Sequence, residues 1–344
     1  MKISLLCDMD YSGQTYNIAS FLNRNGHNAV LISEKENPYK YSSMIIKTPT
    51  NLRQIHKTIK SSDIVIFYET MFHLNKVFSL NEELLYGKLI IVLLGGWGFR
   101  TPVYRERDAL IYESLNNYST IKFVSISLDF LDPDWKDNPI WDCKEYRDEG
   151  WSDNVPSCMK NMYWIPPFVD VNRLREQYDF SKPQTPLIVT SPSAGTIWQA
   201  NVATDFNAAI AKLKNKQYNV DIITLVSNDA CLKRKAHASI FFDRIFSVYG
   251  VNSQEAGSFE AAVVTGSSDF VVRNLQKEFD CPFIFVKNHD ELRENIDNLL
   301  DNPKFRKFKG KECYQYVKKV HSGKETMNRL IKIIQNEIKI VDLK

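Results

Sequence analysis

Short, almost continuous apolar runs alternate in the first half of the chain with segments whose apolar residues recur at helical spacing. Strands that are covered on both faces have such runs, and we predict three of them at KISLLC (2–7), NAVLIS (28–33) and DIVIFYE (63–69). Helical spacing occurs between them in TYNIASFLNRNGH (15–27) and TNLRQIHKTIKSS (50–62). A strand, a helix and a strand of this length predict parallel strands joined by a right-handed crossover.

The same alternation continues to residue 127 and then stops. We predict strands at KLIIVLLGG (88–96) and IKFVSIS (121–127), with a helix at YRERDALIYESLNN (104–117) between them. Residues 130–160 are rich in Trp, Asp and Pro and lack periodicity, so they form either a functional loop or an insertion. A second alternation follows the polar segment DFSKPQTP (179–186), which we interpret as the linker between two domains.

Two such halves predict the α/β class, with two Rossmann-like, doubly wound parallel-sheet domains that face each other across a cleft. The predicted limits are 1–180 for the N-terminal domain, 181–325 for the C-terminal domain and 326–344 for a terminal helix that can pack back on the N-terminal domain. Ligands of open α/β sheets bind at the carboxyl ends of the strands, so we expect the site in the cleft.

The motifs of several nucleotide-binding and hydrolytic classes are missing. The turn after the first strand contains only Gly13, where a dinucleotide-binding loop would have three glycines, and neither a Walker A loop nor a G-x-S-x-G elbow occurs. A bilobed binding protein would normally carry a signal peptide and cross its hinge repeatedly, whereas one linker is the simpler interpretation here. The class that remains is a two-domain enzyme that binds a nucleotide without a P-loop, chiefly the GT-B glycosyltransferases.

Composition and charge narrow the range of function classes only slightly. The 344 residues carry a net charge of +3, which is low for a nucleic-acid-binding protein. The longest apolar runs are about ten residues, too short for the roughly 20 that a membrane span needs. Six scattered cysteines without a C-x-x-C pair predict free thiols in a reducing cytoplasm, and we expect no metal and no cofactor.

The segment ASIFFDRIFSVYGVNSQEAGSFEAAVV (238–264) resembles a pattern of the retaining GT-B family that contains the glycogen synthases and many bacterial sugar transferases. With one gap, eight residues fall on pattern positions: Ala238, Ile240, Asp243, Tyr249, Gly250, Glu255, Ala256 and Val263. IVTSPS (188–193), WIPPFVD (164–170), LGGWGFR (94–100) and the tail 290–317 resemble further family segments more weakly.

The resemblance implies a site for a nucleotide-sugar donor, UDP- or GDP-linked, in the second domain. It implies that Glu255 accepts hydrogen bonds from the ribose hydroxyls, since a carboxylate offers two acceptor oxygens. It also implies that backbone amides at the start of the helix face the diphosphate. The remaining residues assigned to the donor are Tyr249, Gly250, Val251, Asn252, Ser191 and Ser193.

On the first domain, two glycine-containing loops follow buried strands and are assigned to the cleft and the acceptor. The first contributes Gly13 and Gln14, and the second contributes Gly96, Trp97 and Arg100. Both loops have an alternative interpretation as ordinary structural turns. No catalytic residue is assigned; an inverting enzyme would need a base on this domain, for which the candidates are Asp8, Asp10 and Asp108.

The chain departs from the family pattern at positions that, in the family, bind the phosphates or take part in the reaction. The family's first glutamate is Ser247, and its G-x-P becomes Glu260 and Ala262. An ungapped alignment puts Trp198 at its phosphate-binding lysine, and in the first domain its histidine and aspartate become Gly95 and Gly98.

We therefore predict a hexosyl- or pentosyltransferase of the cytoplasm, using a nucleotide sugar and no obligatory metal, with retention implied only by the resemblance. One alternative is a phage-type DNA glycosyltransferase acting on a hydroxymethylated base, favoured by short length and by the basic segments LKRKAHA (232–238) and KFRKFKGK (304–311). The other acceptor class is a glycan or lipid-linked glycan. A third alternative is a non-catalytic nucleotide-sugar binder, and the oligomeric state is left open.

Overall fold

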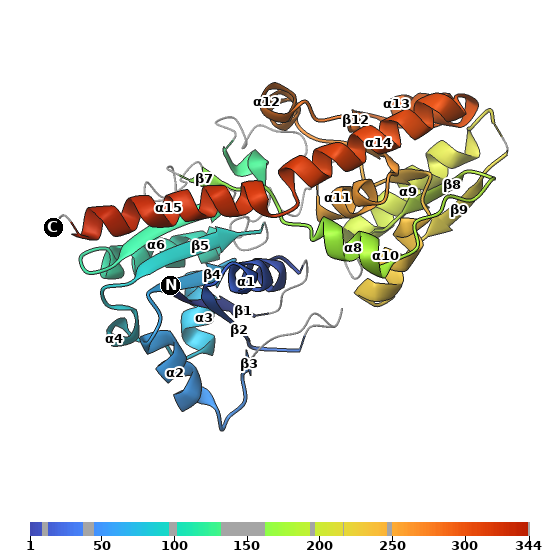
Figure 1. The fold of residues 1–344 in the computed structure, drawn as a ribbon. Coiled ribbons are helices and arrows are strands. Elements are labelled where there is room, and N and C mark those ends of the chain that lie inside the picture. The colour runs from blue at the N-terminus through green and yellow to red at the C-terminus, as the bar shows by residue number, and fades with distance from the viewer. Residues whose placement is uncertain are drawn as a thin grey trace. The chain divides into compact units, whose positions relative to one another are not determined.

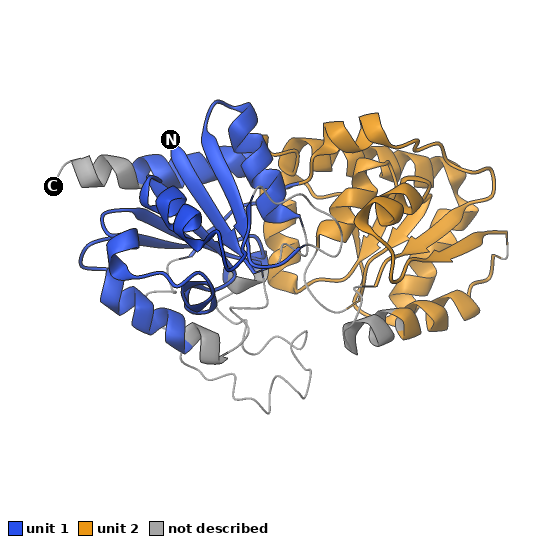
Figure 2. Ribbon diagram, turned by 90° about the horizontal axis from the view of Figure 1, so that it is seen from below, with its two compact units in different colours: residues 1–137, 141–168, 325–344 blue, residues 138–140, 169–324 orange. Residues whose placement is uncertain are grey.

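The computed structural model describes residues 1–8, 13–36, 45–95, 102–131, 162–192, 197–215, 217–245 and 250–342. The chain divides into two compact units (Figure 2). Unit 1 comprises residues 1–137, 141–168 and 325–344, and unit 2 comprises residues 138–140 and 169–324. The free thiols predicted from the sequence are observed for the four described cysteines, Cys7, Cys231, Cys281 and Cys313.

Unit 1 is built on a parallel sheet whose strand order is β3-β2-β1-β4-β5-β6-β7 (Figure 1). Its strands are β1 (Lys2–Cys7), β2 (Asn28–Ser33), β3 (Ile45–Ile46), β4 (Ile64–Tyr68), β5 (Leu89–Leu94), β6 (Thr120–Ser125) and β7 (Tyr163–Trp164). The helices are α1 (Gln14–Arg24), α2 (Leu52–Lys60), α3 (Met71–Val77), α4 (Glu82–Leu85), α6 (Pro102–Leu115) and α15 (Lys324–Asp342), with a 3-10 turn at Leu128–Leu131.

The side chains of these strands alternate between two buried clusters, one on each face of the sheet. Leu5 belongs to a cluster with Ile18 of α1 and Leu330 of α15. Its neighbour Leu6 belongs to a second cluster with Ile55 of α2. Helices therefore cover both faces, which is why the strands are apolar at nearly every position.

Unit 2 contains a second parallel sheet, with the order β12-β11-β10-β8-β9. Its strands are β8 (Leu187–Thr190), β9 (Asn219–Ile222), β10 (Ile240–Phe242), β11 (Ala262–Thr265) and β12 (Ile284–Phe285). The helices are α8 (Val171–Gln177), α9 (Ile197–Ala211), α10 (Asn228–Ala236), α11 (Val251–Ser258), α12 (Asp269–Phe279), α13 (His289–Asp301) and α14 (Pro303–Val320).

The junction between the units differs from the predicted linker at 179–186. The units meet along the chain at residues 168–169, because α8 packs within unit 2: Arg175 Nη1 donates to the carbonyl of Ser258 at 3.0 Å, and the Tyr178 ring packs edge-on against Phe259. The chain passes back into unit 1 at residues 324–325, and apolar residues of α15 belong to a buried cluster of unit 1.

None of the helices in the described part of the chain combines the length and the apolar character that a bilayer crossing requires.

Candidate functional site

Those residues assigned to the donor that the structure describes lie at the carboxyl edge of the sheet of unit 2. Strand β8 pairs in parallel with β10, so Ser191, which follows β8, and Asp243, which follows β10, are at the same edge. Helix α11 begins at this edge after Gly250, whose extended backbone (φ −110°, ψ 170°) precedes the first helical turn. Asn252 in that turn donates from Nδ2 to the carbonyl of Ser191 at 3.2 Å, which ties the helix start to the end of β8.

Glu255 lies one turn further along α11 and forms a buried ion pair that the sequence analysis did not predict. Its Oε2 accepts a hydrogen bond from Nζ of Lys235 at 2.7 Å, and the same ammonium donates to Oδ1 of Asn252 at 2.6 Å. The Lys235 side chain is 1% exposed and that of Glu255 10%. The carboxylate that the sequence analysis assigned to the ribose is therefore already paired with the ammonium group of Lys235 on α10.

The Lys235 ammonium stays charged in this buried place. Burial by itself lowers the pKa of Lys235, but its neighbours Cys231, Glu255 and Asp243 outweigh burial and raise that pKa above its usual value. Removing one partner of a buried ion pair leaves the other charge uncompensated, which typically costs about 3–5 kcal/mol. The pair therefore fixes the position of Glu255 and of the first turn of α11.

A signal for Lys235 was present in the sequence. Leu232, Lys235 and Ala236 recur at spacings of three and four and form the buried residues of α10. A basic run such as 232–238 is typical of a solvated helix face. Of the three cations in α10, however, only Lys233 is exposed, and Arg234 is paired with Asp221.

Asp243, one of the pattern residues, also anchors the start of α11. It is 1% exposed, accepts a hydrogen bond from the hydroxyl of Ser253 at 2.9 Å, and pairs with Nε of Arg244 at 3.2 Å. These contacts join the end of β10 to the start of α11, so this pattern position has a structural role here.

In unit 1, the first glycine loop ends at Gly13, whose backbone conformation favours glycine. Gly13 has a left-handed backbone (φ 69°) at the start of α1, a conformation that favours residues without a Cβ. Gln14 is fully buried: its Nε2 donates to the carbonyl of Phe168 at 3.0 Å, and its Oε1 accepts from the amide of Phe168 at 2.7 Å. Gln14 thus holds α1 to the segment after β7, and the structure does not support an acceptor contact for it.

Asp108, a candidate base, also has a structural role. It is 3% exposed and accepts hydrogen bonds from the Thr70 hydroxyl (2.8 Å) and from the amides of Met71 (3.1 Å) and Phe72 (2.7 Å), at the start of α3. Burial raises the pKa of Asp108 to about 6. Asp8, another candidate, lies at the end of β1 with Lys35, 2.9 Å from its Oδ1.

Several predicted site residues lie outside the described residues or have side chains that are not described. The former are Tyr249, Ser193, Gly96, Trp97, Arg100 and Asp10, and the latter include Trp198.

The sequence matches no family model and no curated protein. Solved structures do match over the whole chain. One is an alpha-glucosyltransferase in complex with UDP-glucose and DNA containing an abasic site (TM-score 0.65, 13% identity, 97% of this chain and 99% of that chain covered). Another is the sucrose-phosphate synthase of Thermosynechococcus elongatus (TM-score 0.58, 10% identity, 100% of both chains), and a third is a glycosyltransferase from Rickettsia africae ESF-5 (TM-score 0.59, 13% identity, 98% of both).

The chain has the GT-B fold. The predicted fold class, with two Rossmann-like parallel-sheet domains, is confirmed. At 13% identity or less, the likeness shows the fold and leaves the reaction of this GT-B protein to be argued from its own residues.

Two departures from the family pattern have a local explanation in the GT-B structure. Glu260, at the place of the family's glycine, keeps a left-handed backbone (φ 62°), and its side chain pairs with Arg175 at 3.0 Å. Gly95 stands where relatives have histidine, and a Cβ there would overlap Oε1 of Glu69 and the hydroxyl of Tyr68, so a side chain at this position would require these groups to move.

Proposed function

We propose that this GT-B protein is a glycosyltransferase that moves a sugar from a nucleoside diphosphate donor to a hydroxyl acceptor. The observation that carries the proposal is the arrangement of Glu255 on α11, held by Lys235 at the carboxyl edge of a Rossmann-like sheet. Solved GT-B proteins of similar structure contain UDP or UDP-glucose, which supports the same donor class here.

In the proposed complex, Glu255 accepts from the ribose hydroxyls through Oε1, because Oε2 is bonded to Lys235. The amides of Val251 and Asn252 belong to the first turn of α11, where peptide dipoles favour an anion, and we assign them to the diphosphate. Lys235 is buried and acts by positioning Glu255 and Asn252.

Calorimetry with UDP, GDP and ADP tests the donor assignment. Glu255→Gln keeps an oxygen for Lys235 but removes the charge, and a charge-assisted hydrogen bond is worth about 1.5–3 kcal/mol, so affinity should fall about tenfold or more. Glu294→Gln, an exposed glutamate of α13, is the matched control and should bind as the wild type does. Unchanged affinity in a folded Glu255→Gln variant would remove Glu255 from the ribose site.

A non-catalytic nucleotide-sugar binder is the alternative, since Ser247 and Trp198 stand at the family's first glutamate and lysine. Slow hydrolysis of a panel of UDP- and GDP-sugars separates the two. Turnover of one donor supports the enzyme, and the anomeric configuration of its product, read by NMR, decides between retention and inversion. Tight binding of nucleotides without turnover on any acceptor supports the binder.

DNA is the acceptor candidate that a specific observation favours. The exposed cations Lys304, Lys307 and Lys311 recur at spacings of three and four along α14 and so share a face. One GT-B protein of similar structure was solved with DNA. We propose that this face contacts phosphates, with a glycan acceptor as the alternative.

A salt series on duplex DNA binding tests the phosphate contacts. Each contact contributes about −0.9 to the slope of log K against log salt, so the triple alanine variant of these lysines should reduce the slope by about 2.7. The same number of alanines at Lys57, Lys60 and Lys76 of unit 1 serves as the control. A slope near zero in the wild type would return the acceptor to a glycan.

A further inference from the structure

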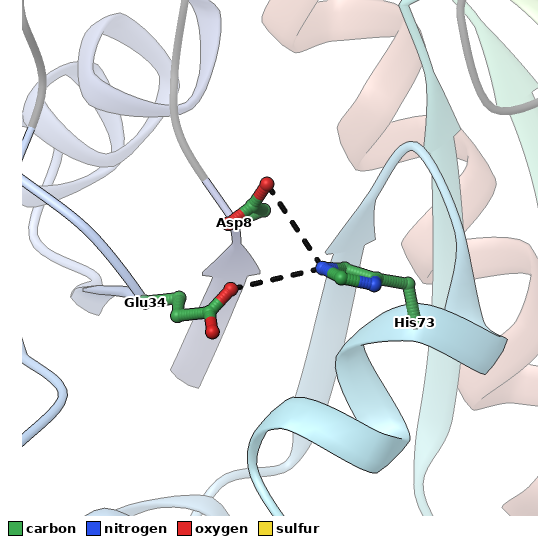
Figure 3. A group of neighbouring side chains, drawn as sticks. All are labelled: Asp8, Glu34 and His73. Carbon is green, nitrogen blue, oxygen red and sulfur yellow. Dashed lines mark ion pairs between the residues drawn. The ribbon is translucent and has the colours of Figure 1, made fainter.

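Three metal-ligating side chains from separate parts of unit 1 meet at the carboxyl edge of its sheet. Asp8 directly follows β1 and Glu34 directly follows β2, and the pairing continues beyond the strands, since the Glu34 amide donates to the Cys7 carbonyl at 3.0 Å. Strand β4 flanks β1 on the other side, and α3, which begins three residues after β4, carries His73. The strand order β2-β1-β4 therefore brings the three side chains together (Figure 3).

The distances from His73 to the two carboxylates suit a shared ion better than direct hydrogen bonds. Nε2 of His73 lies 3.9 Å from Oδ2 of Asp8 and 3.7 Å from Oε2 of Glu34, and the three ligand atoms lie within 4.8 Å of one another. A hydrogen bond would need about 2.7–3.2 Å. Ligands about 2.1 Å from one cation, at tetrahedral or wider angles, are about 3.4–4.0 Å apart.

The local charges leave a place for a second positive charge. Oε2 of Glu34 is buried and accepts no hydrogen bond from the described residues. Nζ of Lys35 lies 2.9 Å from Oδ1 of Asp8 and 3.6 Å from Oε2 of Glu34, so one ammonium faces two carboxylates, and its half-exposed side chain can turn to solvent.

Hydrogen bonds at the start of α3 also help to fix the position of His73. The three hydrogen bonds that Asp108 accepts at Thr70, Met71 and Phe72 fix the first turn of α3, directly before His73. Such support of a ligand-bearing segment favours a defined geometry.

We propose that Asp8, Glu34 and His73 bind one divalent cation of the Mn²⁺ or Zn²⁺ class. Two carboxylates suit Mn²⁺ and an imidazole suits Zn²⁺. Three protein ligands leave positions open for water or for an oxygen of another ligand. The proposal reverses the expectation of no metal that the sequence favoured, and it does not depend on the proposed sugar transfer.

Titration of the full chain with Mn²⁺ alone, without nucleotide, tests the site by calorimetry and electron paramagnetic resonance. We expect one ion per chain, and Glu34→Gln and His73→Gln should each weaken its binding by about tenfold or more, since even outer partners of a metal site contribute that much. Glu113→Gln and His27→Gln, elsewhere in unit 1, are the controls and should not change it. Absence of binding, or equal binding by all variants, would overturn the proposal.

Lys35→Met provides a test with the opposite sign. Its ammonium lies 2.9 Å from Oδ1 of Asp8 and competes with a cation, so its removal should raise Mn²⁺ affinity and enlarge the shift of the melting temperature by Mn²⁺. A purely structural salt-bridge cluster predicts a lower melting temperature for Lys35→Met and no response to Mn²⁺, and that result would contradict the site.

Discussion

At the scale of single residues, the contact with Lys235 shows that Glu255 is part of a buried ion pair. A glutamate near a helix start could simply face solvent, but here it shares a buried contact with an ammonium, and both are tied to Asn252. One residue therefore links the stability of unit 2 to the geometry of the candidate donor site.

We expect Lys235→Met to lower the free energy of unfolding by about 3–5 kcal/mol, because Glu255 would keep a buried and unpaired charge. The double variant Lys235→Met/Glu255→Gln should regain part of that loss, because no buried charge remains. Lys233→Met, at an exposed position of the same helix, should change stability by less than about 0.5 kcal/mol. Urea unfolding of the four proteins measures this, and equal losses for Lys233 and Lys235 would contradict the pair.

Asp108 predicts a pH dependence with a definite sign. Its pKa is raised by burial from 3.8 to about 6 in the folded protein, so the folded state binds more protons than the unfolded state between these values. The stability from Asp108 is present below about pH 4 and is lost, by up to about 3 kcal/mol, as the pH rises through 6.

The difference in unfolding free energy between wild type and Asp108→Asn isolates this term, because other groups titrate in both proteins. We expect the difference to fall between pH 4.5 and 6.5. A flat difference in this range, with a rise below about pH 4, would mean that the three hydrogen bonds to the carboxylate outweigh its burial.

At the scale of elements, the close approach of α14 to the turn between α11 and β11 depends on Gly310. A Cβ at this position would overlap the carbonyl oxygen of Glu260, whose left-handed backbone forms the turn. The atom in the way is backbone, so it cannot move aside as a flexible side chain can.

Gly310→Ala should therefore destabilise unit 2 by about 1–3 kcal/mol, as overpacking does. Helix propensity alone predicts the reverse, a gain of about 1 kcal/mol, so the sign decides between the two effects. Lys311→Ala, the exposed next residue, is the control in thermal melting.

At the scale of the whole molecule, the last helix of unit 1 packs in the same core as its first strand and helix. Helix α15 places Met327, Leu330, Ile333 and Ile334 in the same buried cluster as β1 and α1. Burial of a large apolar side chain contributes about 1.5–3 kcal/mol, so these four contribute an amount comparable to the stability of a typical domain.

A chain that ends at Gly323 should therefore leave unit 1 unfolded, as seen by loss of its melting transition. Leu330→Ala should cost about 2–5 kcal/mol, whereas Lys332→Ala, exposed on the same helix, should be near neutral. A truncated chain that melts as the full chain does would show that α15 is dispensable.

The sequence by itself determined the fold class and most of the elements. Buried parallel strands are apolar along their length, and runs such as residues 2–7 and 89–94 are recognisable for that physical reason. The short helix α3 was missed, because seven residues are too few to establish a period, and it carries His73.

Tertiary structure alone decided which polar groups meet. Asp8, Glu34 and His73 are far apart in the sequence, and only the strand order β2-β1-β4 makes them neighbours. Lys235 likewise meets Glu255 because the helices before and after β10 both pack at one sheet. Periodicity reports which face of an element is buried, whereas the partner across that face depends on contacts between distant segments, which local spacing does not encode.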